Sequence, residues 1–472
     1  MNIIDIIIIF NLNTLAMKKK FIFLLSLAYF IFGDLCAQNE QVKSCVSLSG
    51  NNSLILDYYD TLTVTYSEIS ATGQGAFMAE LNSYPGGRTV PLPQELKVND
   101  MDFYSENLMF GGYYTKAGQE RGALGRLFIP NSFDWGQNVE YFFFDWISFD
   151  NGVSVLVTNI KRIEKILDQQ STLSHFRIAC VADCLVASGS DTTTSTALCE
   201  VLYNNSLWTI YVYLNKDTNL VYTDLAVMDN YVVAVAVNQS ANNIHLNLFT
   251  TTFPFVNHYA ITGIGFDVVD EFFGNQALVE SLQNDKFALA SHYVSAAEAG
   301  TSVMLFNCCS VAPALSFASR QVQNTIPVID KSWDLREMKY EPSSGLIYLL
   351  HQTKPTVSSN SESVVDEYDF VNFASCNLLS SWLSGNKFFG LGLWASGGFQ
   401  TVGSNGAIMT TFKKHGSLNP EMCASYNMKE YYLVSPKVVD VEDESSVTSC
   451  DIGSVTYTPD PSGVTINREC TE

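Results

Sequence analysis

One sequence repeat constrains the fold more than any other feature. In each copy an acidic residue is followed by a short turn and then by an apolar run. In three copies the run begins eight residues after the acid, with acids at Asp100, Asp145 and Asp224 and runs at Leu108, Val153 and Val232. Looser copies begin at Glu280 and Asp334. A repeated unit of this kind predicts an array of similar small sheets.

Each copy has the composition of a small antiparallel sheet. The apolar runs alternate with polar residues or are rich in Val, and Asn, Asp, Gly and Ser separate them, which is typical of strands joined by turns. The starting acids are separated by 45, 79, 56 and 54 residues, and about 45 residues suffice for one propeller blade. The longest interval requires an insertion, and residues 159–171 are interpreted as a short helix within it.

A small twisted sheet cannot cover both of its faces, whereas sheets arranged radially cover one another. The predicted fold is therefore all-β, a β-propeller of six or seven blades, with tandem β-sandwiches as the alternative. We expect the propeller to occupy residues 38–420, with strands from residues 45–93 closing the ring. Residues 421–472 are interpreted as a disulfide-held C-terminal extension.

The N-terminal residues have the pattern of a secretory signal peptide. Three lysines after Met17 precede an apolar run that ends before the small residues Cys36 and Ala37. Such a run is too short for a permanent membrane span, although one long signal anchor is the alternative. Residues 1–37 are therefore predicted to be removed, with residues 1–16 interpreted as a misassigned start. The mature protein is expected in the periplasm, at the cell surface or in the medium.

An exported protein meets oxidising conditions, which favour disulfides. Ten cysteines follow the predicted signal and are disulfide candidates: Cys45, Cys180, Cys184, Cys199, Cys308, Cys309, Cys376, Cys423, Cys450 and Cys470. Their spacing leaves the pairing open. The group formed by Cys180, Cys184 and Cys199 lacks a CxxC pair and a nearby fourth ligand, so loop disulfides are favoured there over a zinc site.

Composition and charge narrow the class of partner. With 47% apolar and 16% charged residues, the chain has the composition of a well-packed globular protein. Its formal net charge of −22 repels phosphate backbones and anionic membrane surfaces, so nucleic acid is excluded as the expected partner. A glycan, a peptide or another extracellular protein remains as the partner.

In repeat shape, residues 45–420 resemble the loosely defined group of exported bacterial β-propeller proteins. The repeats lack the "GH" and "WD" residues of WD40 units and the paired glycines of kelch units, so the resemblance rests on shape alone. It implies a rigid ring whose loops line a binding face or a central tunnel, and it implies no particular ligand.

Motifs that would identify a catalytic centre, a cofactor or a metal site are lacking. The sequence contains no GxSxG elbow, HExxH helix or P-loop, and its six histidines are scattered. Asn215, Asp217 and Asn219 have the spacing of calcium-loop oxygens, but the glycine and the distal glutamate of that loop are absent, which favours a plain turn. No catalytic, cofactor or metal residue is therefore predicted.

Equivalent strand ends in a ring lie on the same rim, so residues that end each second run are expected to converge. These candidate rim residues are Tyr113, Asn159, Asn238, His292, His351 and Trp394. Aromatic, amide and imidazole groups suit a sugar or another small polar ligand. The alternative is that strands simply end where polar residues begin.

Two classes of function follow. The first is an exported, non-catalytic binding or scaffold protein, which requires only a shaped face. The second is a secreted propeller enzyme, such as a glycosidase, lyase or peptidase-like hydrolase, which requires paired carboxylates in a central pocket. The scarcity of motifs favours the first.

Overall fold

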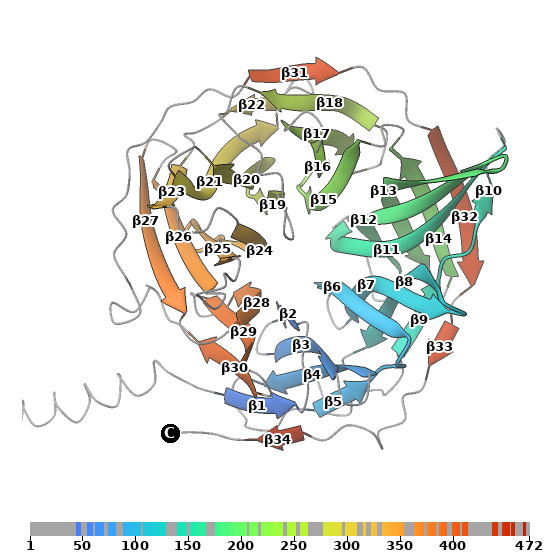
Figure 1. Ribbon diagram of the computed structural model, residues 1–472, viewed down its shortest axis with the longest axis horizontal. Coiled ribbons are helices and arrows are strands. Elements are labelled where there is room, and N and C mark those ends of the chain that lie inside the picture. Colours follow the sequence, from blue (N-terminus) through green and yellow to red (C-terminus); the bar gives the residue numbers. More distant parts are fainter. Residues whose placement is uncertain are drawn as a thin grey trace, which may run out of the picture.

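The computed structural model confirms the all-β propeller. It describes most of residues 44–468, with longer gaps at 82–87, 129–138, 167–174, 263–276, 309–314, 354–362, 414–436 and 458–465 and short gaps between other strands. Seven antiparallel sheets surround a common axis as blades (Figure 1). The described residues form strands and turns and no helix.

The first four blades follow the chain from its N-terminal side. Blade 1 contains β2 (Leu54–Tyr59), β3 (Leu62–Ile69), β4 (Gln74–Leu81) and β5 (Arg88–Pro91). Blade 2 contains β6 (Leu96–Tyr104), β7 (Asn107–Lys116), β8 (Gln119–Phe128) and β9 (Val139–Phe143). Blade 3 contains β10 (Ile147–Ser148), β11 (Val153–Ile166), β12 (His175–Ser188), β13 (Asp191–Asn204) and β14 (Leu207–Leu214). Blade 4 contains β15 (Leu220–Val227), β16 (Tyr231–Asn238), β17 (Asn243–Thr250) and β18 (Phe255–Thr262).

The remaining three blades complete the ring. Blade 5 contains β19 (Ala277–Leu282), β20 (Lys286–Val294), β21 (Glu298–Cys308), β22 (Leu315–Phe317) and β23 (Val322–Pro327). Blade 6 contains β24 (Trp333–Glu341), β25 (Leu346–Thr353), β26 (Ser363–Val371) and β27 (Ser375–Leu383). Blade 7 contains β28 (Lys387–Leu393), β29 (Phe399–Asn405), β30 (Ile408–Lys413) and, from the N-terminal side of the chain, β1 (Ser44–Leu48).

Four strands near the C-terminus lie on the outer edges of blades that are distant in sequence (Figure 1). Their partners are β18 for β31 (Lys437–Val441), β14 for β32 (Ser446–Gly453), β9 for β33 (Val455–Tyr457) and β1 for β34 (Ile466–Arg468). The C-terminal part of the chain therefore follows the perimeter and covers sheet edges that would otherwise offer unpaired backbone groups.

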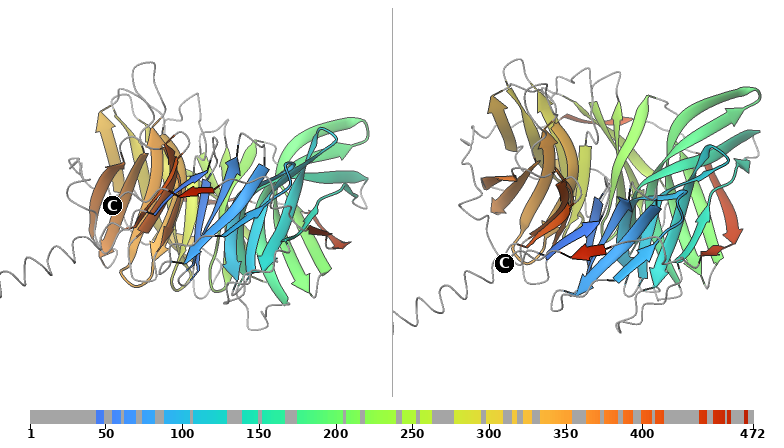
Figure 2. Two further views of the ribbon diagram at one scale, coloured as in Figure 1. Left: turned by 90° about the horizontal axis from the view of Figure 1, so that it is seen from below. Right: turned by 60° about the horizontal axis from the view of Figure 1, so that its bottom comes forward.

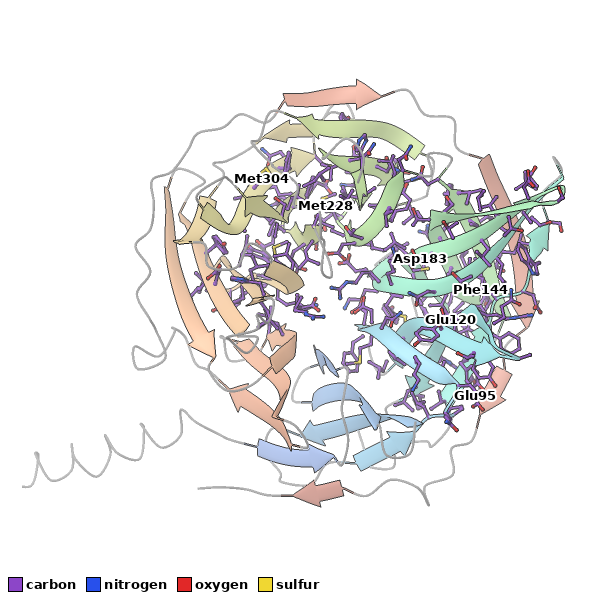
Figure 3. The ribbon with its side chains drawn as sticks, viewed as in Figure 1. Glu95, Glu120, Phe144, Asp183, Met228 and Met304 are labelled. Atoms are coloured by element: carbon purple, nitrogen blue, oxygen red, sulfur yellow. The ribbon has the colours of Figure 1, made fainter. Side chains whose placement is uncertain are left out.

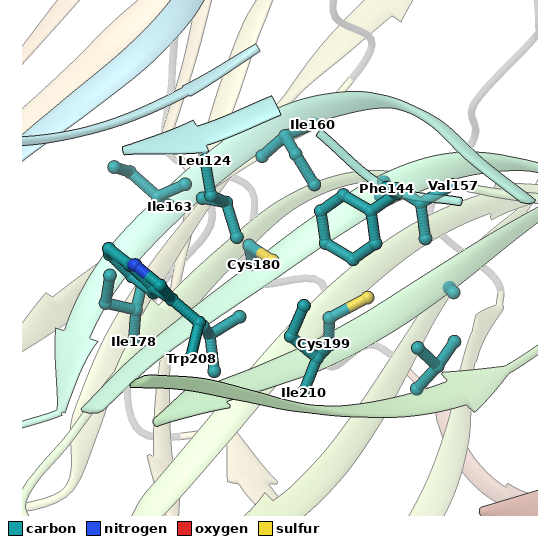
Figure 4. Packing of buried hydrophobic residues seen from close by; sticks show 14 of the residues in the cluster. Leu124, Phe144, Val157, Ile160, Ile163, Ile178, Cys180, Cys199, Trp208 and Ile210 are labelled. Atoms are coloured by element: carbon teal, nitrogen blue, oxygen red, sulfur yellow. The ribbon is translucent and has the colours of Figure 1, made fainter. Parts of the chain in front are cut away.

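The core lies between the blades, where side chains of adjacent sheets meet (Figure 3). Every residue from Val232 to Val237 in β16 is buried, because neighbouring blades cover both faces of this strand. Between blades 2 and 3, an aromatic group surrounds the fully buried Trp208, whose ring centroid lies 4.8 Å from that of Tyr203 and 5.1 Å from that of Phe142. Figure 4 shows part of this cluster.

The predicted helix in residues 159–171 is wrong, because residues up to Ile166 belong to β11, and the segment 167–174 lies outside the described residues. The register of β11 against β12 shifts between Val157 and Asn159 and again between Ile160 and Arg162. The second shift adds one residue, which keeps Ile160 and Ile163 on one face of the strand, and Ile166 is buried on the other face. The buried positions therefore recur every third residue. That spacing resembles the period of a helix, although the backbone is extended.

One further feature of the fold bears on function. The hairpin of β12 and β13 stands out from the ring (Figure 2), and its tip, from Ser188 to Thr194, is exposed. In the part of the chain that the structure describes, no helix has the length and apolar character needed to cross a bilayer. The predicted signal peptide at residues 1–37 lies outside the described residues.

Candidate functional site at the propeller axis

The innermost strands of blades 2 to 6 line a cavity of about 230 Å³ at the axis. Their charged side chains form two rows. In β6, β11 and β24 the two rows are two residues apart and lie on the same side of the strand, whereas β15 and β19 each contribute to one row. The first row consists of Asp100, Arg162, Asp224 and Glu337. The second row consists of Asp102, Glu164, Glu280 and Lys339. These eight residues are the axial cluster.

A β-bulge places each residue of the first row. The register shifts by one residue immediately before the first-row position in β6, β11, β15 and β24. The extra residues at these shifts are Asn99, Lys161, Thr223 and Arg336. Because a bulge turns the following side chain relative to a regular strand, its repetition directs the four charged residues towards the axis.

Three of the extra residues connect their own blade to the next one. Each donates a side-chain hydrogen bond to a backbone carbonyl of the neighbouring innermost strand, with donor–acceptor distances of 2.8 Å from Asn99 to Ile160, 2.9 Å from Lys161 to Tyr222 and 3.0 Å from Thr223 to Ala277. Lys161 also pairs with Asp183, labelled in Figure 3, at 2.6 Å. The bulge therefore fixes the relative height of adjacent blades.

The carboxylates of the axial cluster also connect neighbouring blades, but they do so as hydrogen-bond acceptors. Five of the six accept a hydrogen bond from a backbone N–H of the next innermost strand: Ile163 to Asp100 (2.8 Å), Lys165 to Asp102 (2.7 Å), Val227 to Glu164 (2.6 Å), Val279 to Asp224 (2.9 Å) and Tyr340 to Glu280 (3.1 Å). Hydrogen bonds to an ionised acceptor are stronger than neutral ones. Three of the recurring acids of the sequence repeat, Asp100, Asp224 and Glu280, are thus connectors between blades.

Arg162 joins three blades at once. Its side chain is 11% exposed, and its nitrogens lie 3.7 Å from Asp100 Oδ1, 3.5 Å from Asp224 Oδ1 and 3.3 Å from Glu337 Oε2. Its Nη2 donates to the backbone oxygen of Arg336 at 2.9 Å. Three carboxylates around one guanidinium leave an excess of negative charge, which makes proton uptake by the carboxylates favourable.

The pKa values of the buried acids are raised, chiefly by burial. Burial raises the pKa of Asp100 to about 7 and that of Asp224 to about 6, although Arg162 opposes both shifts. Burial likewise raises the pKa of Glu280 to about 8, against the opposing charge of Lys339. The pKa of Glu164 is well above its ordinary value because of burial and then the neighbouring charges of Glu280 and Asp102. The cluster therefore retains protons near neutral pH.

Arg162, at the centre of the cluster, stays charged. Burial lowers the pKa of Arg162, but Glu337, Asp224 and Asp100 raise it by more, so the guanidinium remains charged.

Among the described residues, no group of three or more His, Cys, Asp or Glu side chains has an arrangement that could hold a metal ion. The cavity is also smaller than the roughly 300–1,000 Å³ of typical small-molecule sites.

The six predicted rim residues do not all occupy equivalent positions. Asn238, His292 and His351 lie at or near the ends of β16, β20 and β25, and Tyr113 lies near the end of β7. Asn159 instead lies on β11, the innermost strand of blade 3, where it accepts a hydrogen bond from Asn99 at 2.5 Å.

The side chain of His351 is 1% exposed, and its Nε2 lies 2.9 Å from Asp366 Oδ2 in the interior of blade 6, so it does not face a ligand on the surface. Trp394 lies outside the described residues. The ligand-binding rim of six residues remains a prediction.

The sequence alignment of the repeats was partly wrong as well. Asp145 does not begin an innermost strand but follows β9, with a side chain that is 75% exposed and paired with Arg121. In blade 6 the axial residue is Glu337, three positions after Asp334. The missed signal is a charged–apolar–charged triplet, which occurs at residues 100–102, 162–164 and 337–339. The central apolar residue of each triplet is buried.

The cysteines also differ from the expected loop positions. Cys180 and Cys184 lie on β12 and Cys199 lies on β13, all three buried, and their thiols are not joined to one another. Cys308 is buried at the end of β21. Cys45, Cys376 and Cys450 lie on β1, β27 and β32, and Cys309, Cys423 and Cys470 lie outside the described residues. Disulfides among the ten candidates remain a prediction.

Comparison with known proteins gives only distant structural similarities. No protein-family model and no curated protein matches the sequence. Among solved structures, puromycin hydrolase is similar at a TM-score of 0.40 and 10% identity, over 76% of this chain and 50% of that one, so this chain spans half the length of that protein. A putative 6-phosphogluconolactonase from Bacteroides fragilis is similar at 0.38 and 10% identity, over 85% and 98% of the two chains.

A third structure is a propeller by its own description. The β-propeller domain of the Trilobed protease from Pyrococcus furiosus is similar at a TM-score of 0.29 and 8% identity, over 70% of this chain and 99% of that domain. Similarity at this level carries no information about activity. The function must therefore be argued from the chain's own residues.

Proposed function

We propose that the protein is an exported, non-catalytic binding protein whose rigid propeller presents a face to a glycan, peptide or protein. The observation that carries this proposal is the use of the axial carboxylates. Five of them accept hydrogen bonds from the backbone of the next blade, so their recurrence is explained by the connection of blades without any substrate. Export follows from the signal pattern of residues 1–37.

The charge of the molecule indicates the chemistry of the partner. A net charge of −22 favours neutral or cationic ligands and disfavours anionic ones. A neutral glycan or a basic peptide or protein surface meets this condition. The protruding tip of the β12–β13 hairpin, with exposed threonines at 192–194, supplies hydroxyl groups for such a contact.

The direct test is a screen of the mature protein, residues 38–472, on arrays of neutral glycans, anionic glycans and basic peptides. Binding to a neutral glycan or basic peptide, weakened by salt in the case of the peptide, supports the proposal. Every hit is then incubated with the protein and analysed by mass spectrometry for cleavage. Binding without cleavage is the expected result, and the absence of binding to every array component contradicts the proposal.

The alternative is a secreted hydrolase that uses the axial acids, and one observation favours it. The pKa of Glu280, about 8, leaves this carboxyl protonated at neutral pH, as a general acid requires. Glu280→Gln distinguishes the two functions in the cleavage assay. Loss of a measured cleavage activity in this variant, with unchanged circular dichroism, would establish the enzyme and overturn the binding proposal.

A further inference from the structure

Blade 3 contains three buried cysteines whose positions are fixed by one strand register. In the pairing of β12 with β13, Cys180 lies directly opposite Cys199, and Cys184 lies directly opposite Ser195. All three side chains belong to the same apolar cluster, so they are on one face of the sheet, and Figure 4 shows Cys180 and Cys199 within it. Which two of the three cysteines lie close enough to react therefore depends only on their positions along the two strands.

Only one pair among these three can be joined. Residues directly opposite each other in an antiparallel pair have Cα atoms about 4.5 or about 5.5 Å apart, and both values lie within the roughly 4.4–6.8 Å required by a disulfide. Cys184 is four residues from Cys180 along β12, which corresponds to about 13 Å in an extended strand. It is equally far from Cys199, because its own partner is Ser195.

We infer that Cys180 and Cys199 form a cross-strand disulfide in oxidising surroundings, whereas Cys184 remains a thiol. With a small-molecule disulfide such as oxidised glutathione as the oxidant, the two protein thiols lose two electrons and two protons. One S–S bond forms between Cys180 and Cys199, and the S–S bond of glutathione breaks to give two glutathione thiols. This modification fixes the register of the longest hairpin in the ring.

The timing of the reaction follows from burial. All three thiols are inaccessible in the folded blade. The pKa of Cys180 is raised well above its ordinary value by its hydrogen bond with Cys199 and by burial, and burial raises that of Cys184. Because the thiolate is the reactive form, the folded protein oxidises slowly. The bond is therefore formed during folding, and the inference does not depend on the proposed binding function.

The test uses the full mature chain, unfolded in urea with reductant and refolded with mixed oxidised and reduced glutathione. Remaining thiols are alkylated under denaturing conditions, and the protein is digested with a protease that cleaves before Asp. This digestion separates the three cysteines into peptides 168–182, 183–190 and 191–216. We expect peptide 168–182 to be linked to peptide 191–216, and peptide 183–190 to carry an alkylated Cys184.

Matched variants complete the test. Cys184→Ser is expected to leave the link intact, and Cys199→Ser is expected to abolish it and to leave Cys180 alkylated. If Cys199→Ser does not fold, the peptide map of the unaltered protein still decides the matter. A link that includes Cys184, or alkylation of all three thiols after oxidative refolding to the native circular dichroism spectrum, overturns the inference.

Discussion

Replacement of Arg162 by Met tests whether the axial cluster stabilises the ring. The substitution keeps an apolar stem of similar length but removes the charge that faces Asp100, Asp224 and Glu337 at 3.3–3.7 Å. Removal of one partner from a buried charged group costs about 3–5 kcal/mol, because the remaining charges lose their compensation. We expect a loss of this size in the free energy of unfolding at pH 8, measured by urea denaturation with tryptophan fluorescence.

The pH dependence of the loss makes the test specific. At pH 5, Asp100 and Asp224 bind protons in the folded variant, since their pKa values are already about 7 and about 6 with Arg162 present. Fewer uncompensated charges then remain, so the loss at pH 5 is expected to be clearly smaller than at pH 8.

The control is Arg126→Met. Arg126 has a similar exposure of 17% but a single carboxylate partner, Glu140, at 2.7 Å, and its guanidinium also lies over the ring of Tyr203. We expect a loss of about 1.5–3 kcal/mol, the range for one charged hydrogen bond, with little change between the two pH values. A loss below about 1 kcal/mol for Arg162→Met, equal at both pH values, would refute the role of the axial cluster in stability.

Three further predictions follow from the same structure. The folded-state pKa values of Asp100 and Asp224 exceed the ordinary value near 4. The stability that protonation of these two acids contributes is therefore complete below about pH 4 and is lost as pH rises through about 6 to 7. The urea midpoint should accordingly fall from pH 5 to pH 8, and it should fall less in Asp224→Asn. Gly112→Ala places a Cβ against a backbone carbonyl of β6 and should lower the thermal midpoint more than Gly122→Ala, whose Cβ meets a side chain that can move. Deletion of residues 437–472 uncovers four outer sheet edges and should lower the thermal midpoint and increase light scattering on heating; an unchanged midpoint would contradict a stabilising role.

The architecture could be predicted from the sequence because the repeat is governed by local rules. Apolar runs such as that from Val232 to Val237 identify strands buried on both faces, and their recurrence requires sheets that cover one another. The number of blades could not be fixed, since strands at the two ends of the chain have no local signal for the sheet they join. The pairing of β1 with β30 depends on closure of the whole ring.

The axial site could be predicted only in part. Asp100, Asp224 and Glu280 were noted as repeat markers, and all three line the cavity. Arg162 was missed because the two register shifts in β11 give its neighbours the spacing of an amphipathic helix. A bulge changes the period of a strand without changing its composition, so periodicity alone cannot distinguish the two structures.

The axial cluster also indicates where a partner should be sought. Hydrogen bonds from backbone N–H groups to its carboxylates involve positions that adjacent blades require to keep their relative height. A ligand that displaced these bonds would have to replace contacts between several blades at once. The loops, the β12–β13 hairpin and the perimeter carry no such requirement, because changes there leave the innermost strands intact. Binding specificity in this ring is therefore expected to reside away from the axis, with the charged centre as the rigid support.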